Sequence, residues 1–217
     1  MCYSVSTSII SYTVGMLSAI FALFTGQYIL GMLILFYVQI QMSELIIWKG
    51  IDDDNISLNK TGTMFGKYLL PTHNIAIGLG IILAVYMSGE RFKTQDFLPL
   101  VVGIVFYIYI ILFVYSPQDS DTTYPADRSC KDKSCQNNKN RLKWSYPTSW
   151  YIYGFLISLL FLIIYVNPLK SKIFLCIFFS LTFISAATLY PESTSSIWCF
   201  FAAIFAPLVV FVNYMIT

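Results

Sequence analysis

The sequence predicts an all-α fold, an integral membrane bundle of seven transmembrane helices. Of its 217 residues, 57% are hydrophobic, 18% aromatic and only 11% charged, whereas soluble domains have about 45–50% apolar and about 25% charged residues. Apolar stretches of about 20 residues, the length that crosses a bilayer as a helix, recur between charged clusters. The alternating apolar and polar segments of about ten residues that form membrane barrels are absent from the pattern.

Seven apolar stretches are long enough to be these helices. They cover residues 5–24, 28–48, 64–87, 97–115, 150–166, 173–190 and 195–216. The fourth, fifth and sixth contain no Asp, Glu, Lys, Arg or His. Lys67 and His73 fall in the first half of the third span, so its start can shift by a turn. No basic residue precedes the first span, which is longer than a signal-peptide core, so we predict a retained helix.

Short turns and one polar loop connect the spans. Residues 25–27 and 167–172 are so few that the helices flanking each must be antiparallel neighbours, and residues 191–194 form a third tight connection. Residues 116–149 are rich in Asp, Lys, Asn and Ser, and this loop is too small and too polar to bury a core. We therefore predict a single polytopic membrane domain over residues 1–217.

Two observations about orientation disagree. An odd number of spans places loop 51–61 and the polar loop on the side of the N-terminus. Lysine and arginine are more frequent on that side, which favours a cytoplasmic location. However, Asn55 and Asn59 begin N-glycosylation motifs, and Cys130 and Cys135 can close a disulfide if their loop is outside, or stay free thiols if it is cytosolic. We predict an N-terminus outside and a cytoplasmic C-terminus.

Composition and cysteine spacing argue against several functions. Thirteen basic and eleven acidic residues give a net charge of +2, too small for the basic field that nucleic-acid binding requires. The chain has one histidine and no second cysteine pair beside Cys130 and Cys135, so we predict no metal site. Cys176 and Cys199 lie in apolar spans and are predicted to be small buried hydrophobic residues.

Polar residues recur at helical spacing on one face of the first two spans. In the first span Ser8 and Ser11 belong to a narrow stripe of small and polar side chains. In the second span Gln41, Glu44 and Trp48 share a face. Because an ionisable group in a membrane span faces the bundle or water, we expect both faces to look inward.

The third span carries the only histidine of the chain, His73, on a face where small residues follow at four-residue spacing. Glu44 and His73 lie at depths that differ by a few ångströms, so a Glu44–His73 pair is geometrically allowed. The alternative places Glu44 in the hydrated headgroup region near Lys49 or Lys67, while His73 binds a serine of the first span. Both interpretations remain open from the sequence.

Cys2 becomes the first residue of the chain if the initiator methionine is removed. Its thiol and amine would then lie at the membrane surface on the side of Glu44 and His73. Thiolate, imidazole and carboxylate together can act as a nucleophilic set or as metal ligands. No ligand spacing supports a metal site, so Cys2 is retained as a candidate nucleophile only.

The segment from Met1 to Ser4 and the run from Gln41 to Trp48 resemble a family of uncharacterised small multi-pass membrane proteins of bacteria and giant viruses. Proteins of that family open with Met-Cys-aromatic-Ser and carry Gln-x-x-Glu-x-x-x-Trp in the second helix. The resemblance covers about the first fifty residues. It implies a membrane fold and draws attention to Cys2, Ser4, Gln41, Glu44 and Trp48, and it supplies no chemistry.

Three hypotheses of function follow. The first is a non-enzymatic membrane protein in the lipid bilayer that binds a small or lipidic ligand, or a partner, in a pocket lined by Ser8, Ser11, Gln41, Glu44 and His73. The second is a carrier or channel in which Glu44 and His73 take up and release protons. The third is an enzyme with Cys2 as nucleophile, His73 as base and Glu44 as orienting group. The sequence does not identify a cofactor or an oligomeric state.

Overall fold

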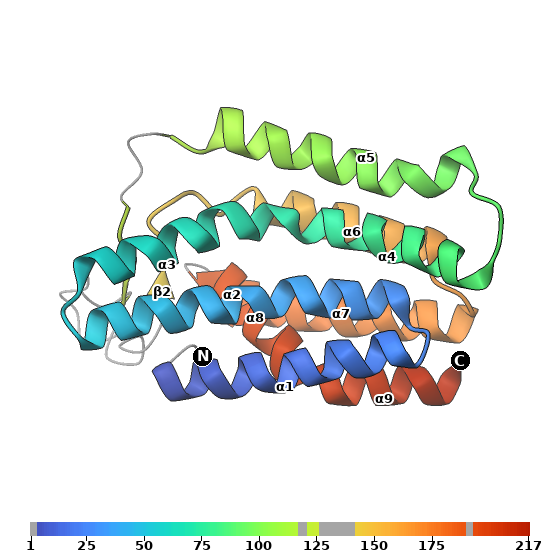
Figure 1. Cartoon of the computed structure of the whole chain (residues 1–217), viewed down its shortest axis with the longest axis horizontal. Coiled ribbons are helices and arrows are strands. Elements are labelled where there is room, and N and C mark those ends of the chain that lie inside the picture. Colours follow the sequence, from blue (N-terminus) through green and yellow to red (C-terminus); the bar gives the residue numbers. More distant parts are fainter. Residues whose placement is uncertain (1–3, 117–120, 126–141, 190–192) are drawn as a thin grey trace.

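The computed structural model describes residues 4–116, 121–125, 142–189 and 193–217. In these residues the chain forms a bundle whose helices lie side by side along the long axis, with α1 starting at one end and α9 finishing at the other (Figure 1). The helices are α1 (Val5–Phe24), α2 (Tyr28–Asp52), α3 (Ile56–Leu69), α4 (His73–Ser88), α5 (Thr94–Tyr109), α6 (Tyr151–Tyr165), α7 (Leu169–Leu189), α8 (Thr194–Ile204) and α9 (Ala206–Ile216). The predicted all-α class is confirmed.

Within the described residues, fewer candidate membrane spans are found than the seven predicted. In the part of the chain that the structure describes, five segments are long and apolar enough to cross a bilayer: α1, α2, α3 through α4, α5 with the turn that follows it, and α7. The pair α8 and α9 is a sixth candidate. Helix α6 has 15 residues and is about 22 Å long, shorter than the roughly 30 Å of a hydrocarbon core. The protein is a multi-pass membrane protein with five or six candidate spans.

A bend divides the predicted span 195–216. Helix α8 ends at Ile204, α9 begins at Ala206, and the two helices are inclined by 55°. Pro207 occupies the first turn of α9. Its ring removes one backbone donor and clashes with the preceding turn, so a straight helix cannot continue through this point.

The loop predicted at residues 51–61 is mostly helical. Helix α2 continues to Asp52 and α3 begins at Ile56, so the predicted third span starts at Ile56 instead of residue 64. The side-chain oxygen of Asn55 accepts a hydrogen bond from the backbone nitrogen of Leu58 at 3.0 Å and thereby caps α3. Helix α3 therefore begins in a polar segment, before the apolar stretch that predicted the third span.

Helix α3 runs into α4 through a single 3₁₀ turn. This turn, η1 (Leu70–Thr72), contains Pro71, which is tolerated because it lies at the start of a new helical segment. The segment Ile56–Ser88 is therefore a continuous element of 33 residues. It carries His73 at the first position of α4.

Two glycines allow α5 to pack on α4, its main neighbour. A β-carbon on Gly78 would lie 2.4 Å from Cα of Leu100, and one on Gly103 would lie 2.8 Å from the backbone nitrogen of Ile75. Both distances are far below van der Waals contact, so the two backbones touch directly at these points. Most of the remaining surface of α5 is exposed, and a π-helical turn, η2 (Ile110–Val114), completes this span.

The described part of the polar loop closes one end of the bundle. Strands β1 (Tyr124–Pro125) and β2 (Leu142–Lys143) pair antiparallel there. Asn59 of α3 holds this segment, because its side-chain nitrogen donates to the carbonyl of Thr123 at 2.8 Å and its oxygen accepts from the Thr123 nitrogen at 2.9 Å. Rings of Tyr115, Trp144, Tyr146 and Trp150 pack against one another beside it.

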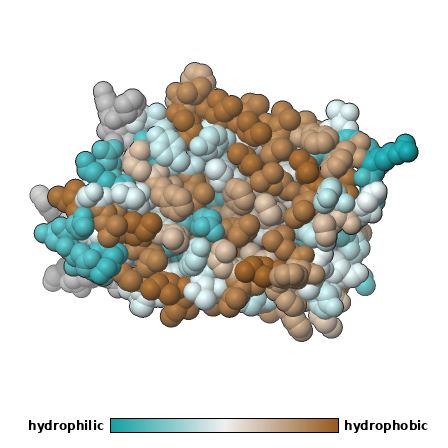
Figure 2. Space-filling model, viewed as in Figure 1, coloured by the Kyte–Doolittle hydropathy of each residue, from teal (hydrophilic) through white to brown (hydrophobic). Residues whose placement is uncertain are grey.

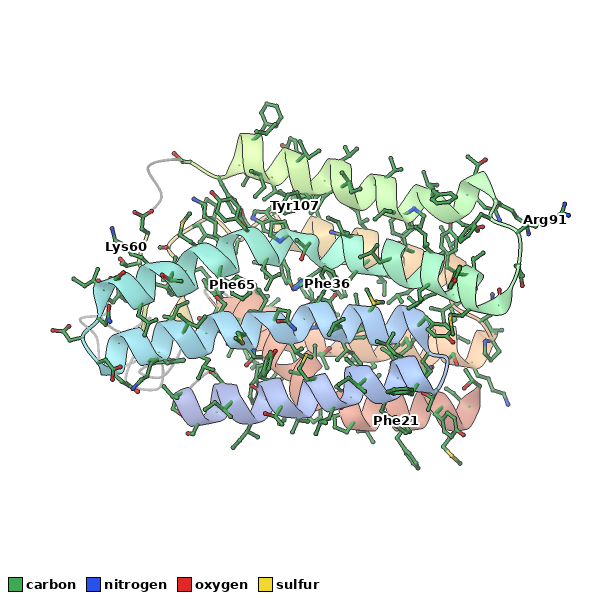
Figure 3. The ribbon with its side chains drawn as sticks, viewed as in Figure 1. Phe21, Phe36, Lys60, Phe65, Arg91 and Tyr107 are labelled. Atoms are coloured by element: carbon green, nitrogen blue, oxygen red, sulfur yellow. The ribbon has the colours of Figure 1, made fainter. Side chains whose placement is uncertain are left out.

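The outside of the bundle is apolar and its two ends are polar. Figure 2 shows a mostly hydrophobic face with hydrophilic residues gathered mainly at the ends of the long axis. Lys60 and Arg91 mark these opposite ends (Figure 3). Large exposed side chains such as Phe24, Phe113 and Leu181 are typical of helices in contact with lipid.

Candidate functional site

The polar stripes of the first two spans face each other inside the bundle. Ser8, Ser11 and Gln41 are fully buried, and Trp48 is 6% exposed. The hydroxyl of Ser11 donates to Oε1 of Gln41 at 2.7 Å and joins α1 to α2. The inward orientation expected from the helical spacing is therefore observed.

Glu44 lies one turn beyond Gln41 on the same face of α2 and is fully buried. The hydroxyl of Ser196 on α8 donates a hydrogen bond to its Oε1. Glu44 also interacts electrostatically with Tyr146 in the loop that closes the bundle. Burial raises the pKa of Tyr146 well above its ordinary value, and the neighbouring Tyr115 and Glu44 add to this shift, so Tyr146 is a neutral phenol at physiological pH.

A second set of polar contacts joins α4, α6 and α8. His73 is 3% exposed, and its Nδ1 lies 3.0 Å from the hydroxyl of Tyr151. The same hydroxyl lies 3.4 Å from Sγ of the buried Cys199. The other ring nitrogen of His73, Nε2, is buried and has no hydrogen-bond partner within 3.5 Å among the described residues. The backbone of Phe36 lies close to the His73 ring.

Glu44 and His73 therefore have different partners. Among the described residues no hydrogen bond or ion pair joins them, because Glu44 points to α8 and His73 points to α6. The alternative from the sequence, a hydrated Glu44 and a His73 bound to a serine of the first span, does not describe the structure either, since Glu44 is buried and His73 contacts a tyrosine.

The space beside His73 is very small. The cavity there has a volume of about 10 Å³ and is lined by His73, Asn74, Ser158 and several rings. Ser158 donates to Oδ1 of Asn74 at 2.8 Å, while the rings of Tyr37 and Trp198 fill most of the remaining space. A cavity of this size holds one water molecule at most. Of the residues predicted to line a ligand pocket among the first three spans, His73 lines this cavity, and the cavity has no room for such a ligand.

Sequence reasoning missed Tyr151, Ser196 and Cys199. Tyr151 stood at the start of an apolar span, where a ring at the headgroup level is the ordinary expectation. Ser196 and Cys199 are spaced three residues apart on α8, as Gln41 and Glu44 are on α2. That shared spacing was a signal for a polar face on the last span, because residues three apart lie on one side of a helix.

The other predicted residues are either outside the described ranges or in other parts of the fold. Cys2, Cys130 and Cys135 lie outside the described residues. Asn59 is 3% exposed and its amide binds Thr123, whereas Asn55 is exposed just before α3. The folded chain therefore presents the asparagine of the first glycosylation motif and buries that of the second. Within the described ranges, no group of three or more His, Cys, Asp or Glu side chains could hold a metal ion.

We predict that Tyr151→Phe destabilises the bundle. Loss of one hydroxyl leaves both His73 Nδ1 and Cys199 Sγ without their contact, and an unsatisfied buried polar group costs about 1–3 kcal/mol. Thermal unfolding in detergent measures the change. Tyr153→Phe is the matched control because Tyr153 is 63% exposed on the same helix. Equal unfolding midpoints for the two variants would show that the Tyr151 contacts contribute nothing.

A larger cavity lies at the other end of the bundle, where the α1–α2 turn, the α6–α7 connection and the end of α9 come together (Figure 1). Its volume is about 270 Å³. Polar lining side chains come from three segments: Thr25, Gln27, Tyr165, Asn167, Asn213 and Thr217. Gly26, with φ of +80°, makes the tight turn that brings Gln27 to this position.

The amides of Gln27 and Asn213 hold the cavity wall together. Nε2 of Gln27 donates to the carbonyl of Val210 at 3.2 Å and to the hydroxyl of Thr25 at 3.0 Å. Nδ2 of Asn213 donates to Oε1 of Gln27 at 2.7 Å. Asn213 is 4% exposed, and its Oδ1 has no hydrogen-bond partner among the described residues.

Comparisons of the chain with protein-family models, with curated proteins and with solved structures find no match. The resemblance of the first fifty residues to a family of small multi-pass membrane proteins stays a prediction. The function is therefore argued from the geometry of the two polar regions.

Proposed function

We propose that this multi-pass membrane protein binds a small or lipidic ligand, and that the ligand occupies the cavity between the α1–α2 turn and α9. One observation carries the proposal: this cavity has a volume of about 270 Å³, against about 10 Å³ beside His73. Polar residues, among them Thr25, Gln27 and Asn167, also line this cavity. Binding sites combine an enclosed space with a few such polar groups.

Binding accounts for the geometry better than conduction does. The buried residues of α2 between Gln27 and Tyr37 are Leu30, Gly31, Leu33 and Ile34, none of which offers a polar side chain. Along α2, an apolar stretch of buried residues thus separates Glu44 from the cavity at Gln27. A solute or proton pathway across a bilayer needs polar groups along its length, so two unconnected polar regions favour a site open to one side.

The proposed orientation keeps the N-terminal start of α1 and the α2–α3 turn outside. The exposed glycosylation motif at Asn55 supports this orientation, since glycans are added outside the cytoplasm. The ligand cavity lies at the opposite end of the bundle (Figure 1). In this orientation the ligand enters from the cytoplasmic half of the bilayer.

The test uses a variant that fills the cavity. Ala84 of α4 lines the cavity and is half-buried, so Ala84→Phe places a ring in the space that the ligand would occupy. Native mass spectrometry of the protein purified in mild detergent then detects bound small molecules. We expect a ligand mass on the wild-type protein and its loss from Ala84→Phe.

Ala187→Phe is the matched control. Ala187 is equally half-buried, lies on α7 and does not line the cavity, so its substitution should leave the ligand mass unchanged. A ligand mass that persists in Ala84→Phe would contradict the proposed site. So would a wild-type protein that carries no added mass even after incubation with a total lipid extract of its host membrane.

A further inference from the structure

One face of α2 is left unburied by the rest of the described chain, and it carries an amide at the middle depth of the membrane. We infer that two copies of this chain associate through this face in the bilayer, with the Gln39 amides of the two copies hydrogen-bonded to each other. The inference is independent of the ligand cavity, because Gln39 does not line it. It is carried by the depth of Gln39, the orientation of its amide and the pattern of the residues around it.

Gln39 lies in the middle of a membrane span. At about 1.5 Å of rise per residue, it is about 16 Å along α2 from Tyr28 and about 14 Å from Trp48. The hydrocarbon core of a bilayer is about 30 Å thick, so lipid headgroups and bulk water are roughly 15 Å away from this depth. A polar group that faces lipid here finds a hydrogen-bond partner only in another protein segment.

The carbonyl oxygen of the Gln39 amide is open and lacks a donor. Nε2 of Gln39 donates to the carbonyl of Leu35 at 3.1 Å, and because a carbonyl only accepts, this contact fixes which end of the amide is nitrogen. The other contact of Nε2 is with Sδ of Met16 at 3.4 Å, which is a weak acceptor. Oε1 accepts no hydrogen bond from the described residues, and it is not among their fully buried polar atoms, since Gln39 is only half-buried. An unsatisfied acceptor in hydrocarbon is costly, so this oxygen requires a donor from outside the chain.

Gln39 is the centre of an uncharged stripe along α2. The stripe consists of residues that are not buried and that follow one another at three- and four-residue steps: Met32, Leu35, Gln39, Met42 and Ile46. This spacing is typical of the seam between two helices that cross at about 20°. Helix α1 and the α3–α4 element flank α2 and α8 lies behind it, so the stripe is on the side toward the viewer in Figure 1. The surface seen from that side is mostly apolar, with a small hydrophilic area near its middle (Figure 2).

A second copy of this chain supplies the missing donor at the required depth. Two copies inserted in the same direction are related by a two-fold axis along the membrane normal, so a residue near the axis meets its own counterpart. An amide is both donor and acceptor, and Gln39 is therefore complementary to Gln39 of the second copy. Each Nε2 keeps its bond to the Leu35 carbonyl and turns its other hydrogen from Met16 to Oε1 of the second copy. Both acceptors are then satisfied, and the single polar residue in an apolar seam fixes the register of the two copies.

Single-molecule photobleaching of the fluorescently labelled full-length protein in phosphatidylcholine vesicles counts the copies in each complex. We expect wild-type dimers whose fraction falls as the protein is diluted with lipid. Gln39→Leu should dimerise at least about tenfold more weakly, because it loses both hydrogen bonds of the pair. Ser180→Leu is the matched control: Ser180 is half-buried and lies as far along α7 as Gln39 does along α2, and its replacement should leave dimerisation unchanged.

Cross-linking locates the interface without changing Gln39. Met42 is 37% exposed and lies one turn from Gln39 on the same stripe. In a chain whose native cysteines are replaced by alanine, Met42→Cys should form a disulfide-linked dimer in the vesicles when copper phenanthroline and oxygen oxidise the two thiols. Ile184→Cys, at a position of α7 that is 56% exposed, should remain monomeric under the same conditions.

Three results would overturn the inference. The first is a wild-type protein that is monomeric at every ratio of protein to lipid, including one that associates with a different membrane protein through this face. The second is a Gln39→Leu dimer as stable as that of the wild type. The third is a dimer that cross-links through Ile184→Cys and not through Met42→Cys. The ligand cavity is tested separately by Ala84→Phe, so either proposal can fail without the other.

Discussion

Gly78→Val is expected to detach α5 from the bundle and to lower the stability of the protein by about 3 kcal/mol or more. A β-carbon at Gly78 lies 2.4 Å from Cα and 2.5 Å from the nitrogen of Leu100, so the obstacle is backbone, which cannot move aside as a side chain can. Helix α5 packs mainly on α4 and has little other support. Thermal unfolding in detergent, followed by circular dichroism, measures the loss.

Two further variants make this result specific. Gly78→Ala adds only the β-carbon and should fall between the wild type and Gly78→Val. Ala187→Val makes a similar change in size at a half-buried position of α7 and should leave the unfolding midpoint nearly unchanged. Matching midpoints for Gly78→Val and Ala187→Val would show that α4 and α5 do not touch at Gly78.

Trp198→Ala is expected to lower the stability by about 3–5 kcal/mol, the range seen when a buried tryptophan is truncated. Trp198 is 2% exposed, and its ring contacts those of Tyr37, Phe155 and Phe183 at centroid distances of 4.7, 5.4 and 5.6 Å. Its indole nitrogen also donates to the hydroxyl of Thr182 at 3.1 Å. In a bilayer, the lost packing contacts of the ring account for more of this destabilisation than the lost hydrogen bond does.

The measurement for Trp198 is the fraction of folded protein during titration with a denaturing detergent. Trp198→Phe keeps a ring and should lose less stability than Trp198→Ala. Phe113→Ala is the control for an aromatic residue in contact with lipid, since Phe113 is 74% exposed. If Trp198→Ala is as stable as Phe113→Ala, the Trp198 ring does not stabilise the bundle through its buried contacts.

The helical membrane fold could be predicted from the sequence because it depends on local composition. The first span ends at the same residues as α1, since its apolar stretch is bounded by Ser4 and by the Gly26 turn. The extension of α3 back to Ile56 could not be predicted from hydropathy, because a polar helix beyond the bilayer has no apolar stretch to mark it. Its support is tertiary: Asn59 binds Thr123, the residue before β1.

The candidate site could be predicted only in part. Burial of Glu44 and His73 follows from their positions in apolar spans. Their partners could not be predicted, because Ser196 and Tyr151 are more than 75 positions away in the chain and meet them only through the packing of α6 and α8. The Gln27–Asn213 contact joins residues separated by 186 positions, and neither residue carries a charge that would have singled it out.

The most direct test of ligand binding at this cavity is a density map of the protein in lipid nanodiscs made with the neutral and phospholipid fractions of its host membrane. We predict non-protein density that fills the cavity between the α1–α2 turn and α9. A cavity that holds only ordered water, or that is closed by side chains, would contradict the account.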